Sequence, residues 1–196
     1  MEKIVRIVGG GLAGAEAAYQ LARRGVRADL YEMRPYRMTE AHATGDLGEL
    51  VCSNSLRSSL ITAPAGVLKE EMRRLDSLVI RVAESNRVPA GSALAVDRES
   101  FARALTRTVE ALPKVRIVRQ EVREIPPGLV IVATGPLTST ALSQHLATLL
   151  GSEHLYFHDA ISPIVTAESI GMTVAFRASR YGRGDNDYLN LPLTRD

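Results

Sequence analysis

The sequence of 196 residues has one cysteine, no tryptophan and few aromatic residues, and these shortages exclude several classes of protein. Because Cys52 is alone, no internal disulfide can form, and a zinc site built on several cysteines is excluded. No apolar stretch is long enough to span a membrane, and the N-terminus runs into an apolar segment without the pattern of a signal peptide. We therefore expect a cytoplasmic protein with no membrane partner.

A large excess of charge of either sign is also missing. Lysine and arginine number 24 against 22 acidic residues, so the formal net charge is +2 and does not require a nucleic-acid partner. Only Lys3, Lys69 and Lys114 are lysine, so the other 21 basic residues (24 minus 3) are arginine. Arginine suits bidentate contacts with phosphate, but a biased genomic composition explains the same excess. Composition therefore leaves nucleic-acid binding open.

The most informative feature that is present is a glycine-rich motif near the N-terminus. It follows the apolar run 4–8, opens an alanine-rich segment that predicts a helix over 15–24, and is followed by a second apolar run, 28–31, that ends at Glu32. A strand, glycine turn, helix, strand and acid in this order predict a dinucleotide-binding βαβ unit. The motif consists of Gly9, Gly10, Gly11, Leu12, Ala13 and Gly14.

Each part of this unit has a mechanical role. Gly9 permits the tight turn, Gly11 lets the backbone approach a pyrophosphate, and Gly14 lets the helix pack closely on the strand. The helix N-terminus offers N–H groups and the positive end of its dipole to the phosphates. We expect Glu32, eighteen residues after Gly14, to accept hydrogen bonds from ribose hydroxyls.

Two observations favour FAD as the dinucleotide. The Glu32 carboxylate repels a 2′-phosphate, which disfavours NADP against FAD or NAD. A second glycine motif lies far downstream, where the apolar run 129–132 leads to Thr134 and Gly135. In FAD proteins of this architecture such a strand brings the chain back beside the nucleotide, so Thr134 and Gly135 join the candidate cofactor-binding residues. Read alone, the same run is a buried parallel strand with a glycine turn.

The fold class expected is α/β: a Rossmann-like FAD-binding domain with a parallel sheet over 1–150, and the truncated start of a second, substrate-facing region over 151–196. Residues 33–66, rich in Pro, Gly, Ser and Thr, are expected to form an inserted active-site loop. Apolar spacing predicts further helices and strands. The helices are 67–86, 98–111 with Asp97 as N-cap, and one capped by Thr138 or Ser139 that runs to 150; 89–96 is extended, and the strands are 115–118, 122–125, 129–132 and 161–165.

Two clusters of polar residues receive ordinary interpretations. Lys69, Glu70, Arg73 and Arg74 form i,i+4 pairs on the polar face of the 67–86 helix, which we interpret as a solvated face rather than an RNA site. His154 and His158 have a spacing of four, but no third ligand accompanies them, so we expect no metal site.

Cys52 lies in the inserted loop, between Val51 and a run of small polar residues. A single cysteine is often a small buried hydrophobic residue. Here, however, Ser53, Asn54 and Ser55 supply donors that could stabilise a thiolate. From the residues alone, a reactive and an inert thiol remain equally open.

Many segments of the chain resemble one family, the folate- and FAD-dependent tRNA uracil-5-methyltransferases (TrmFO), which are related to the GidA/MnmG flavoproteins. The resemblance covers essentially the whole chain, and its most specific motifs are Val51-Cys52-Ser53-Asn54-Ser55 and Tyr188-Leu189-Asn190. The matching segments are 32–35, 37–39, 41–42, 49–55, 68–73, 88–91, 93–98, 133–139, 159–165 and 180–190.

The resemblance implies transfer of a one-carbon unit from 5,10-methylenetetrahydrofolate to C5 of uridine 54 in the T loop of tRNA. It implies FAD as the cofactor, NAD(P)H as the co-substrate that reduces it, and tRNA and folate as partners. It also makes Cys52 the catalytic candidate. A thiolate that adds to C6 of uracil turns C5 into a nucleophile, and a base must later remove the C5 proton.

The sequence departs from the family in two ways. The second family cysteine lies in a Tyr-Leu-Asn-Cys-Pro-Met motif, but this chain reads Tyr188-Leu189-Asn190-Leu191-Pro192-Leu193. Leucine can neither add to a pyrimidine nor transfer a proton. Family members also continue well beyond the length of this chain, so we expect a fragment or a shortened paralogue. The alternative function is therefore a non-catalytic FAD-binding remnant.

Overall fold

A parallel four-stranded sheet forms the centre of the computed structural model, which describes residues 4–151, 165–180 and 183–192. Its strand order is β6-β2-β1-β7. The strands are β1 (Ile4–Val8), β2 (Arg27–Glu32), β6 (Val115–Arg119) and β7 (Leu129–Val132). The α/β class and the parallel sheet predicted from the sequence are confirmed.

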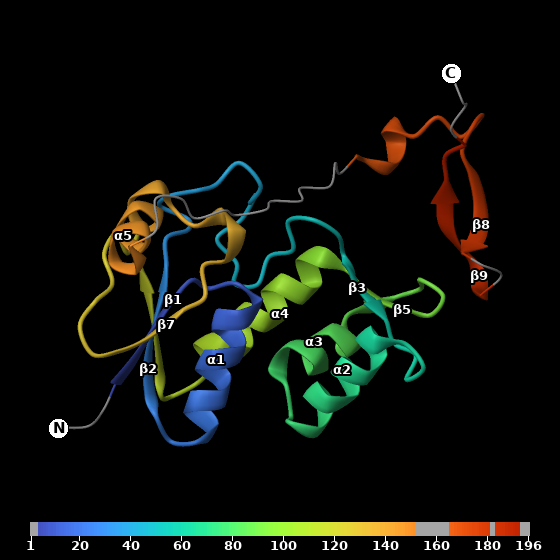
Figure 1. The fold of residues 1–196 in the computed structure, drawn as a ribbon. Helices are drawn as coiled ribbons and strands as arrows, with labels where there is room; N and C mark the ends of the chain where they lie inside the picture. The colour runs from blue at the N-terminus through green and yellow to red at the C-terminus, as the bar shows by residue number, and fades with distance from the viewer. Residues whose placement is uncertain (1–3, 152–164, 181–182, 193–196) are drawn as a thin grey trace.

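In the first βαβ unit, apolar residues of the two strands lie opposite each other, and the helix between the strands packs on them. β1 pairs with β2 in parallel, with Val5 opposite Ala28 and Ile7 opposite Leu30. The helix between them, α1 (Leu12–Arg23), packs on the sheet with its small residues buried, which lets it approach closely. The other large helix on this face is α4 (Arg98–Glu110), which contacts α1 and β6 (Figure 1).

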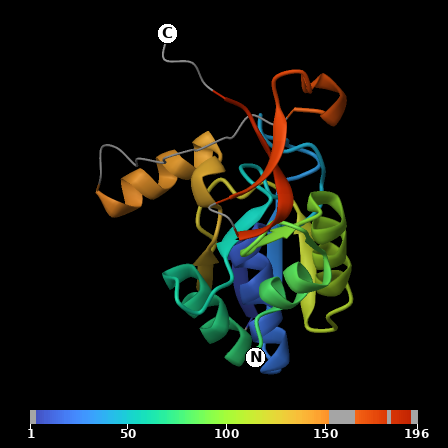
Figure 2. The same ribbon diagram turned by 90° about the vertical axis from the view of Figure 1, so that its right-hand side faces the viewer.

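A second, antiparallel sheet of order β3-β5-β4 lies beside these helices. Leu94 and Val96 of its central strand are buried in the core, so one face of this sheet packs inward. A hairpin of β8 and β9 approaches the same sheet from the C-terminal part of the chain (Figure 2). The elements are β3 (Ser55–Ser58), α2 (Pro64–Arg74), α3 (Leu78–Ser85), β4 (Arg87–Val88), β5 (Ala93–Val96), β8 (Phe176–Arg180) and β9 (Arg183–Asn190).

The remaining helix, α5 (Thr140–Leu150), follows β7 and lies near the carboxyl ends of the parallel strands (Figure 1). Of the two expected caps, Ser139 is the N-cap, and its Oγ accepts from Leu142 N. Asp97 caps α4 as predicted, with Oδ1 accepting from Ser100 N at 2.8 Å. Short 3-10 turns cover Gly135–Leu137 and Ala167–Ser169.

The expected single helix over 67–86 is wrong, because the chain breaks it into α2 and α3. Asp76 has a φ of +55°, which ends α2, and Ser77 then caps α3 by accepting from Ile80 N. The apolar and solvated faces expected for a single helix are therefore also wrong. Leu68 is 56% exposed, whereas Lys69, expected on the solvated face, is only 5% exposed. The ion pair of Glu70 with Arg74 forms at the expected i,i+4 spacing, and Glu70 also pairs with Arg73 at i,i+3.

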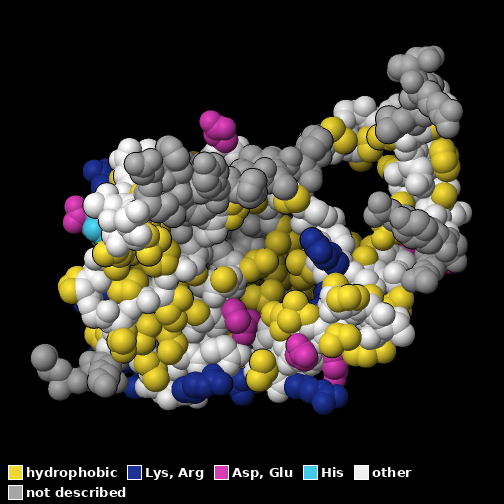
Figure 3. All heavy atoms as spheres, viewed as in Figure 1, with side chains coloured by type: hydrophobic (Ala, Val, Ile, Leu, Met, Phe, Trp, Pro, Cys, Tyr) yellow, Lys and Arg dark blue, Asp and Glu magenta, His cyan; other side chains and the backbone are white. Residues whose placement is uncertain are grey.

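The remaining expectations are corrected by the structure or concern residues outside the described ranges. Residues 122–125 form no strand; Pro126 and Pro127 follow them directly and cannot donate ladder hydrogen bonds. The 33–66 loop contains β3 and the first turn of α2. The 129–132 strand exists, but it is an edge strand, with Leu129 57% exposed; Figure 3 shows apolar side chains gathered on this side. His154, His158 and nearly all of the 161–165 strand lie outside the described residues.

Within the described ranges, no helix has the length and apolar character needed to cross a membrane. In the same part of the chain, no group of three or more His, Cys, Asp and Glu residues is placed to hold a metal ion.

Candidate functional site

The glycine turn between β1 and α1 contains two glycines that close packing requires and a third, Gly11, that faces open space. A Cβ on Gly9, whose φ is +103°, would lie 2.6 Å from the Ala133 carbonyl oxygen. A Cβ on Gly14 would lie 1.8 Å from the Gly9 carbonyl oxygen. A Cβ on Gly11 would meet nothing within 4 Å. Gly9 and Gly14 are therefore required by close packing, while the space beside Gly11 is available to a ligand.

A cavity opens over this turn at the carboxyl ends of β1, β2 and β7. Gly11 is the N-cap of α1, so the first N–H groups of the helix have no acceptor inside the helix. An anion in the cavity would meet these donors and the positive end of the helix dipole. The lining residues are Val8, Gly9, Gly10, Gly11, Tyr31, Glu32, Met33, Arg34, His42, Gln120, Glu121, Val122, Thr134, Leu137, Thr138, Ser139 and Leu142.

Glu32 ends β2, and its buried carboxylate is held by four donors. Its Oε2 accepts from Gly10 N at 2.9 Å and from Arg34 Nη2 at 3.1 Å; its Oε1 accepts from Arg34 N and Nε, both at 3.0 Å. Burial raises the pKa of Glu32, but the Arg34 hydrogen bonds and charge and the Gly10 N–H bring it below the ordinary 4.5. Because a carboxylate offers about four lone-pair positions, a ribose hydroxyl would have to share one with these donors.

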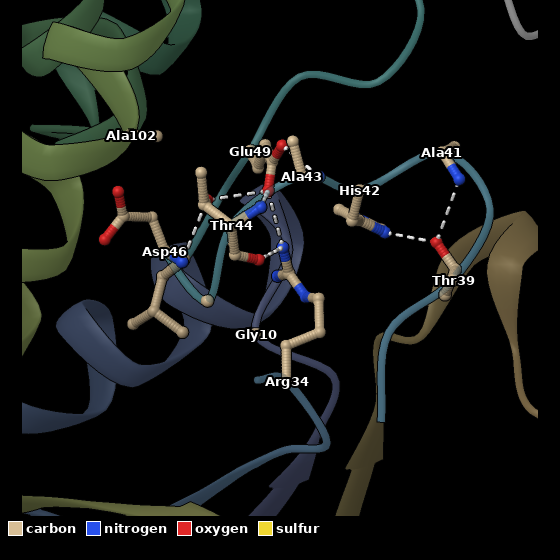
Figure 4. Close-up of polar contacts among 12 residues, drawn as sticks. Gly10, Arg34, Thr39, Ala41, His42, Ala43, Thr44, Asp46, Glu49 and Ala102 are labelled. Carbon is tan, nitrogen blue, oxygen red and sulfur yellow. Dashed lines mark hydrogen bonds and ion pairs between the residues drawn. The ribbon is translucent and has the colours of Figure 1, made fainter. Parts of the chain in front are cut away.

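Arg34 links the glycine turn to the inserted loop. Its side chain is 3% exposed, and its Nη1 donates to Glu49 Oε2 at 3.1 Å and to the Thr44 carbonyl oxygen at 3.3 Å. Glu49 in turn accepts from Ala43 N and from Thr44 N and Oγ1. Figure 4 shows Arg34 pointing into this group of loop residues. Two buried ion pairs of the Arg34 guanidinium, one with Glu32 and one with Glu49, therefore hold the inserted loop against the end of β2.

The rim of the cavity carries a further ion pair and a histidine. Arg37 Nη1 lies 2.7 Å from both carboxylate oxygens of Glu121, which joins the inserted loop to the segment after β6. His42 Nδ1 lies 2.7 Å from Thr39 Oγ1. Burial, and then the Arg34 charge, lower the pKa of His42 against the opposing effect of Glu49. The neutral form of this imidazole is therefore favoured, and it can act as a donor or acceptor at the rim.

The other predicted cofactor residues differ in how they lie relative to the cavity. Thr134 lines the cavity, and its Oγ1 lies 2.6 Å from Thr138 Oγ1. Gly135 has a φ of +62° and begins the turn that leads to α5. Leu12 packs against the core and Ala13 is exposed, so neither side chain lines the cavity.

Cys52 lies in a different cavity, on the outward face of the antiparallel sheet. Asn54 anchors the Cys52 segment to β5, because its Nδ2 donates to the Val96 carbonyl oxygen at 2.9 Å and its own carbonyl oxygen accepts from Val96 N at 3.0 Å. The cavity encloses about 790 Å³, within the usual size of small-molecule sites. It is lined by Cys52, Ser53, Asn54, Ser55, Arg57, Ser58, residues 88–93, Ala95, Asp187 and Tyr188.

The β8–β9 hairpin completes this cavity. Tyr188 Oη donates to the Ala90 carbonyl oxygen at 2.7 Å, and Gly91 N donates to Asp187 Oδ2 at 2.7 Å. Cys52 is half-buried. Gly48 N, four residues before Cys52, donates to the Gly10 carbonyl oxygen. Four residues span at most about 14 Å, so the Cys52 cavity is close to the glycine turn, although no residue that the structure describes lines both cavities.

The glycine turn, the parallel sheet and the acid at the end of β2 define a Rossmann-like α/β domain. The family profile of glucose inhibited division protein A (GidA) matches residues 4–196, and the chain belongs to this family. In agreement, the crystal structure of GidA from Aquifex aeolicus shares the fold, with a TM-score of 0.54 and 16% identity over 69% of this chain and 25% of that one.

Curated relatives are much more similar in sequence. The chain is 57% identical over 196 residues to a protein from Desulforamulus reducens and 58% identical over 193 residues to one from Desulforudis audaxviator. Both are named methylenetetrahydrofolate--tRNA-(uracil-5-)-methyltransferase TrmFO. The matches cover 100% and 98% of this chain but 44% of each relative, so the chain spans less than half of their length.

Sequence reasoning from the residues missed Arg34 and Glu49 as parts of the site. Both belong to segments that carry the family resemblance, Glu32 to Pro35 and Glu49 to Ser55, and this was their only signal. Arg34 and Glu49 lie 15 positions apart along the chain, so local spacing gave no indication that they form an ion pair.

Proposed function

We propose that this chain is the FAD-binding, N-terminal part of a tRNA uracil-5-methyltransferase that takes its one-carbon unit from 5,10-methylenetetrahydrofolate. The observation that carries the proposal is the cavity shared by Cys52 to Ser55 and by Tyr188. These residues come from the two motifs most specific for the family and are more than 130 positions apart. The names of the similar curated proteins support the same activity.

The cavity over the glycine turn supports FAD as the cofactor. The open space beside Gly11 and the first N–H groups of α1 suit a pyrophosphate. Glu32 is proposed to orient the adenosine ribose while it holds Gly10 N, and Thr134 lines the same cavity. When bound and reduced by NAD(P)H, the flavin would supply the electrons that convert the transferred methylene into a methyl group.

In the proposed reaction, Cys52 acts on uridine 54 of the T loop. Its thiolate adds to C6 of uracil, and the electron pair of the C5–C6 bond moves onto C5 and O4 as an enolate. C5 then bonds to the methylene carbon of the folate while the bond of that carbon to N10 breaks. A base removes the C5 proton, and the bond of the methylene carbon to N5 breaks, which releases tetrahydrofolate. A hydride equivalent from the reduced cofactor would convert the methylene into the methyl group as the Sγ–C6 bond breaks and the C5–C6 double bond returns. Asn54 holds the Cys52 segment on β5 through Val96, and Ser53 Oγ accepts from Ser55 N within the segment.

A second candidate function is a non-catalytic flavin-binding module, and Leu191 favours it. Leu191 stands where the family has its second cysteine and is 65% exposed just after β9. Its side chain cannot accept the C5 proton. Since several kcal/mol of barrier lowering come from positioned groups in such reactions, we expect no methylation of tRNA by this chain alone at a rate comparable to that of its relatives.

A methylation assay with tRNA, methylenetetrahydrofolate and NADH tests both candidates. The unaltered chain should be inactive or nearly so, while Leu191→Cys, placed in a chain extended by the C-terminal part that the relatives carry, should show turnover that Cys52→Ala abolishes. Ser85→Ala, an exposed change on α3, serves as the control that should not alter turnover. Turnover that survives Cys52→Ala would contradict the proposed role of the thiol.

A further inference from the structure

Arg57 has a backbone conformation that side chains rarely adopt. Its φ is +67°, in the left-handed region that favours glycine. It lies in β3 where the pairing with β5 is irregular, between Ser55 opposite Ala95 and Ser58 opposite Ala93. Such bulges re-aim side chains and are frequent beside active sites. An arginine at a strained position points to a role for its side chain that glycine could not fill.

The bulge brings both Arg57 and Ser58 to the Cys52 cavity, although strand alternation would send neighbouring side chains to opposite faces. Arg57 is exposed, and its guanidinium makes no ion pair or hydrogen bond with any residue that the structure describes. By contrast, Arg34 and Arg116 each hold a carboxylate through two nitrogens. Arg57 therefore presents an uncommitted bidentate donor at the cavity wall.

The surroundings of Arg57 favour an anion. Among the described residues that line the cavity, Asp187 is the only acid, and one of its oxygens already accepts from Gly91 N. Behind the wall, the buried Lys69 amine donates to the carbonyl oxygens of Ser58 and Ala65, both at 3.1 Å. The positive charges of Arg57 and Arg73 are close enough to contribute, after burial, to a lowered pKa of Lys69. The local field is therefore positive.

We propose that Arg57 binds a backbone phosphate of the tRNA next to the uracil that Cys52 attacks; this inference rests on the proposed function. A guanidinium matches the geometry of a phosphate bidentately. Phosphate and sugar contacts in nucleic-acid complexes are made by arginine together with Ser and Asn side chains and backbone N–H groups. The cavity wall offers Arg57 beside Ser53, Asn54 and Ser55, which favours a nucleotide over the carboxylate of a folate.

The test is equilibrium binding of a fluorescently labelled, unmodified tRNA transcript to the 196-residue chain, at a series of KCl concentrations. Arg57→Gln should weaken binding roughly tenfold and reduce the slope of log K against log salt by about one, as expected for one lost phosphate contact. Arg107→Gln is the matched control, because Arg107 is also exposed and has no ion pair within the described residues. It should leave the slope unchanged.

Arg57→Gly separates binding from folding. Glycine relieves the positive φ, so this variant should unfold at the same or a higher denaturant concentration than the unaltered chain, yet lose tRNA affinity as Arg57→Gln does. A lower unfolding midpoint together with unchanged tRNA affinity would overturn the proposal, since Arg57 would then be structural.

Two further results would also overturn it. One is no tRNA binding by the unaltered chain; the other is a loss in Arg57→Gln confined to binding of tetrahydrofolate, which would assign Arg57 to the folate carboxylate. A parallel FAD titration keeps the two proposals apart. If the chain takes up no FAD but binds tRNA through Arg57, the phosphate contact stands and the proposed flavin function fails.

Discussion

At the scale of single residues, Arg34 explains how the chain holds its inserted loop against the glycine turn. One guanidinium, 3% exposed, pairs with Glu32 on one side and Glu49 on the other. The charges of Arg34, Glu32 and Glu49 are all buried, so the guanidinium compensates the charge of both carboxylates. Removing the single positive charge would leave two carboxylates buried without a cation.

We predict that Arg34→Met destabilises the chain by about 3–5 kcal/mol, the usual cost of breaking a buried pair by removing one partner. Arg37→Met is the matched control, because Arg37 also pairs with an acid but is 46% exposed. It should cost about 1 kcal/mol or less. Urea unfolding of both variants measures the difference. Equal losses would show that the Arg34 pairs contribute no more than a surface pair.

The same group predicts a pH dependence of stability. The folded-state pKa of Glu32 lies below its ordinary value of 4.5. Ionised Glu32 therefore stabilises the fold fully above that value, and this contribution is lost as pH falls through the lower folded-state pKa. We expect the free energy of unfolding of the unaltered chain to fall below about pH 4.5 more steeply than that of Glu32→Gln. Parallel slopes in urea titrations at acid pH would contradict this assignment.

Sequence reasoning at the residue scale succeeded where partners are local. The Asp97 cap needed only Ser100, three residues away, and was predicted. The Arg34–Glu49 pair and the burial of Lys69 depend on how a long loop folds back, and no periodicity marks them. The roles of Cys52 and of Glu32 toward a ligand stay predictions, since they concern molecules outside the chain.

At the scale of elements, the break between α2 and α3 is the clearest departure from the expected pattern. Continuous apolar spacing over 67–86 predicts one helix, yet Asp76 takes a positive φ and Ser77 begins a new one. The reason is tertiary: Glu16 of α1 accepts from Ser77 Oγ at 2.8 Å and from Val79 N at 3.0 Å. A contact across 61 positions therefore outweighs the local helical preference.

We predict that Ser77→Ala costs about 1–2 kcal/mol of stability, because it removes the N-cap of α3 and leaves Glu16 with one donor fewer. Ser85→Ala, at the exposed end of the same helix, should change stability by less than about 0.5 kcal/mol. Thermal or urea unfolding compares the two. A Ser77→Ala variant as stable as the control would show that the break does not depend on this cap.

At the scale of the whole molecule, the predicted βαβ unit, the parallel sheet and the second glycine motif were all found, because each follows from short segments with strong periodicity. The exposure of β7 was not predicted. Leu129 and Val132 are 57% and 43% exposed on an edge strand that the sequence pattern suggested was buried. Hydrophobic runs show that a strand has apolar side chains, but which neighbours cover it depends on the rest of the chain.

The central claim is that the turn at Gly9 to Gly14 holds the pyrophosphate of FAD, and binding of FAD to the purified chain tests it most directly. Gly11→Val places a side chain in the space left for the phosphate, where an added Cβ has no protein atom within 4 Å. Gly171→Val is the control, because a Cβ there is equally clear but lies outside the glycine turn. We predict micromolar or tighter binding of FAD by the unaltered chain and by Gly171→Val, and loss of binding in Gly11→Val with unfolding unchanged. FAD binding of equal strength in all three proteins would contradict the claim.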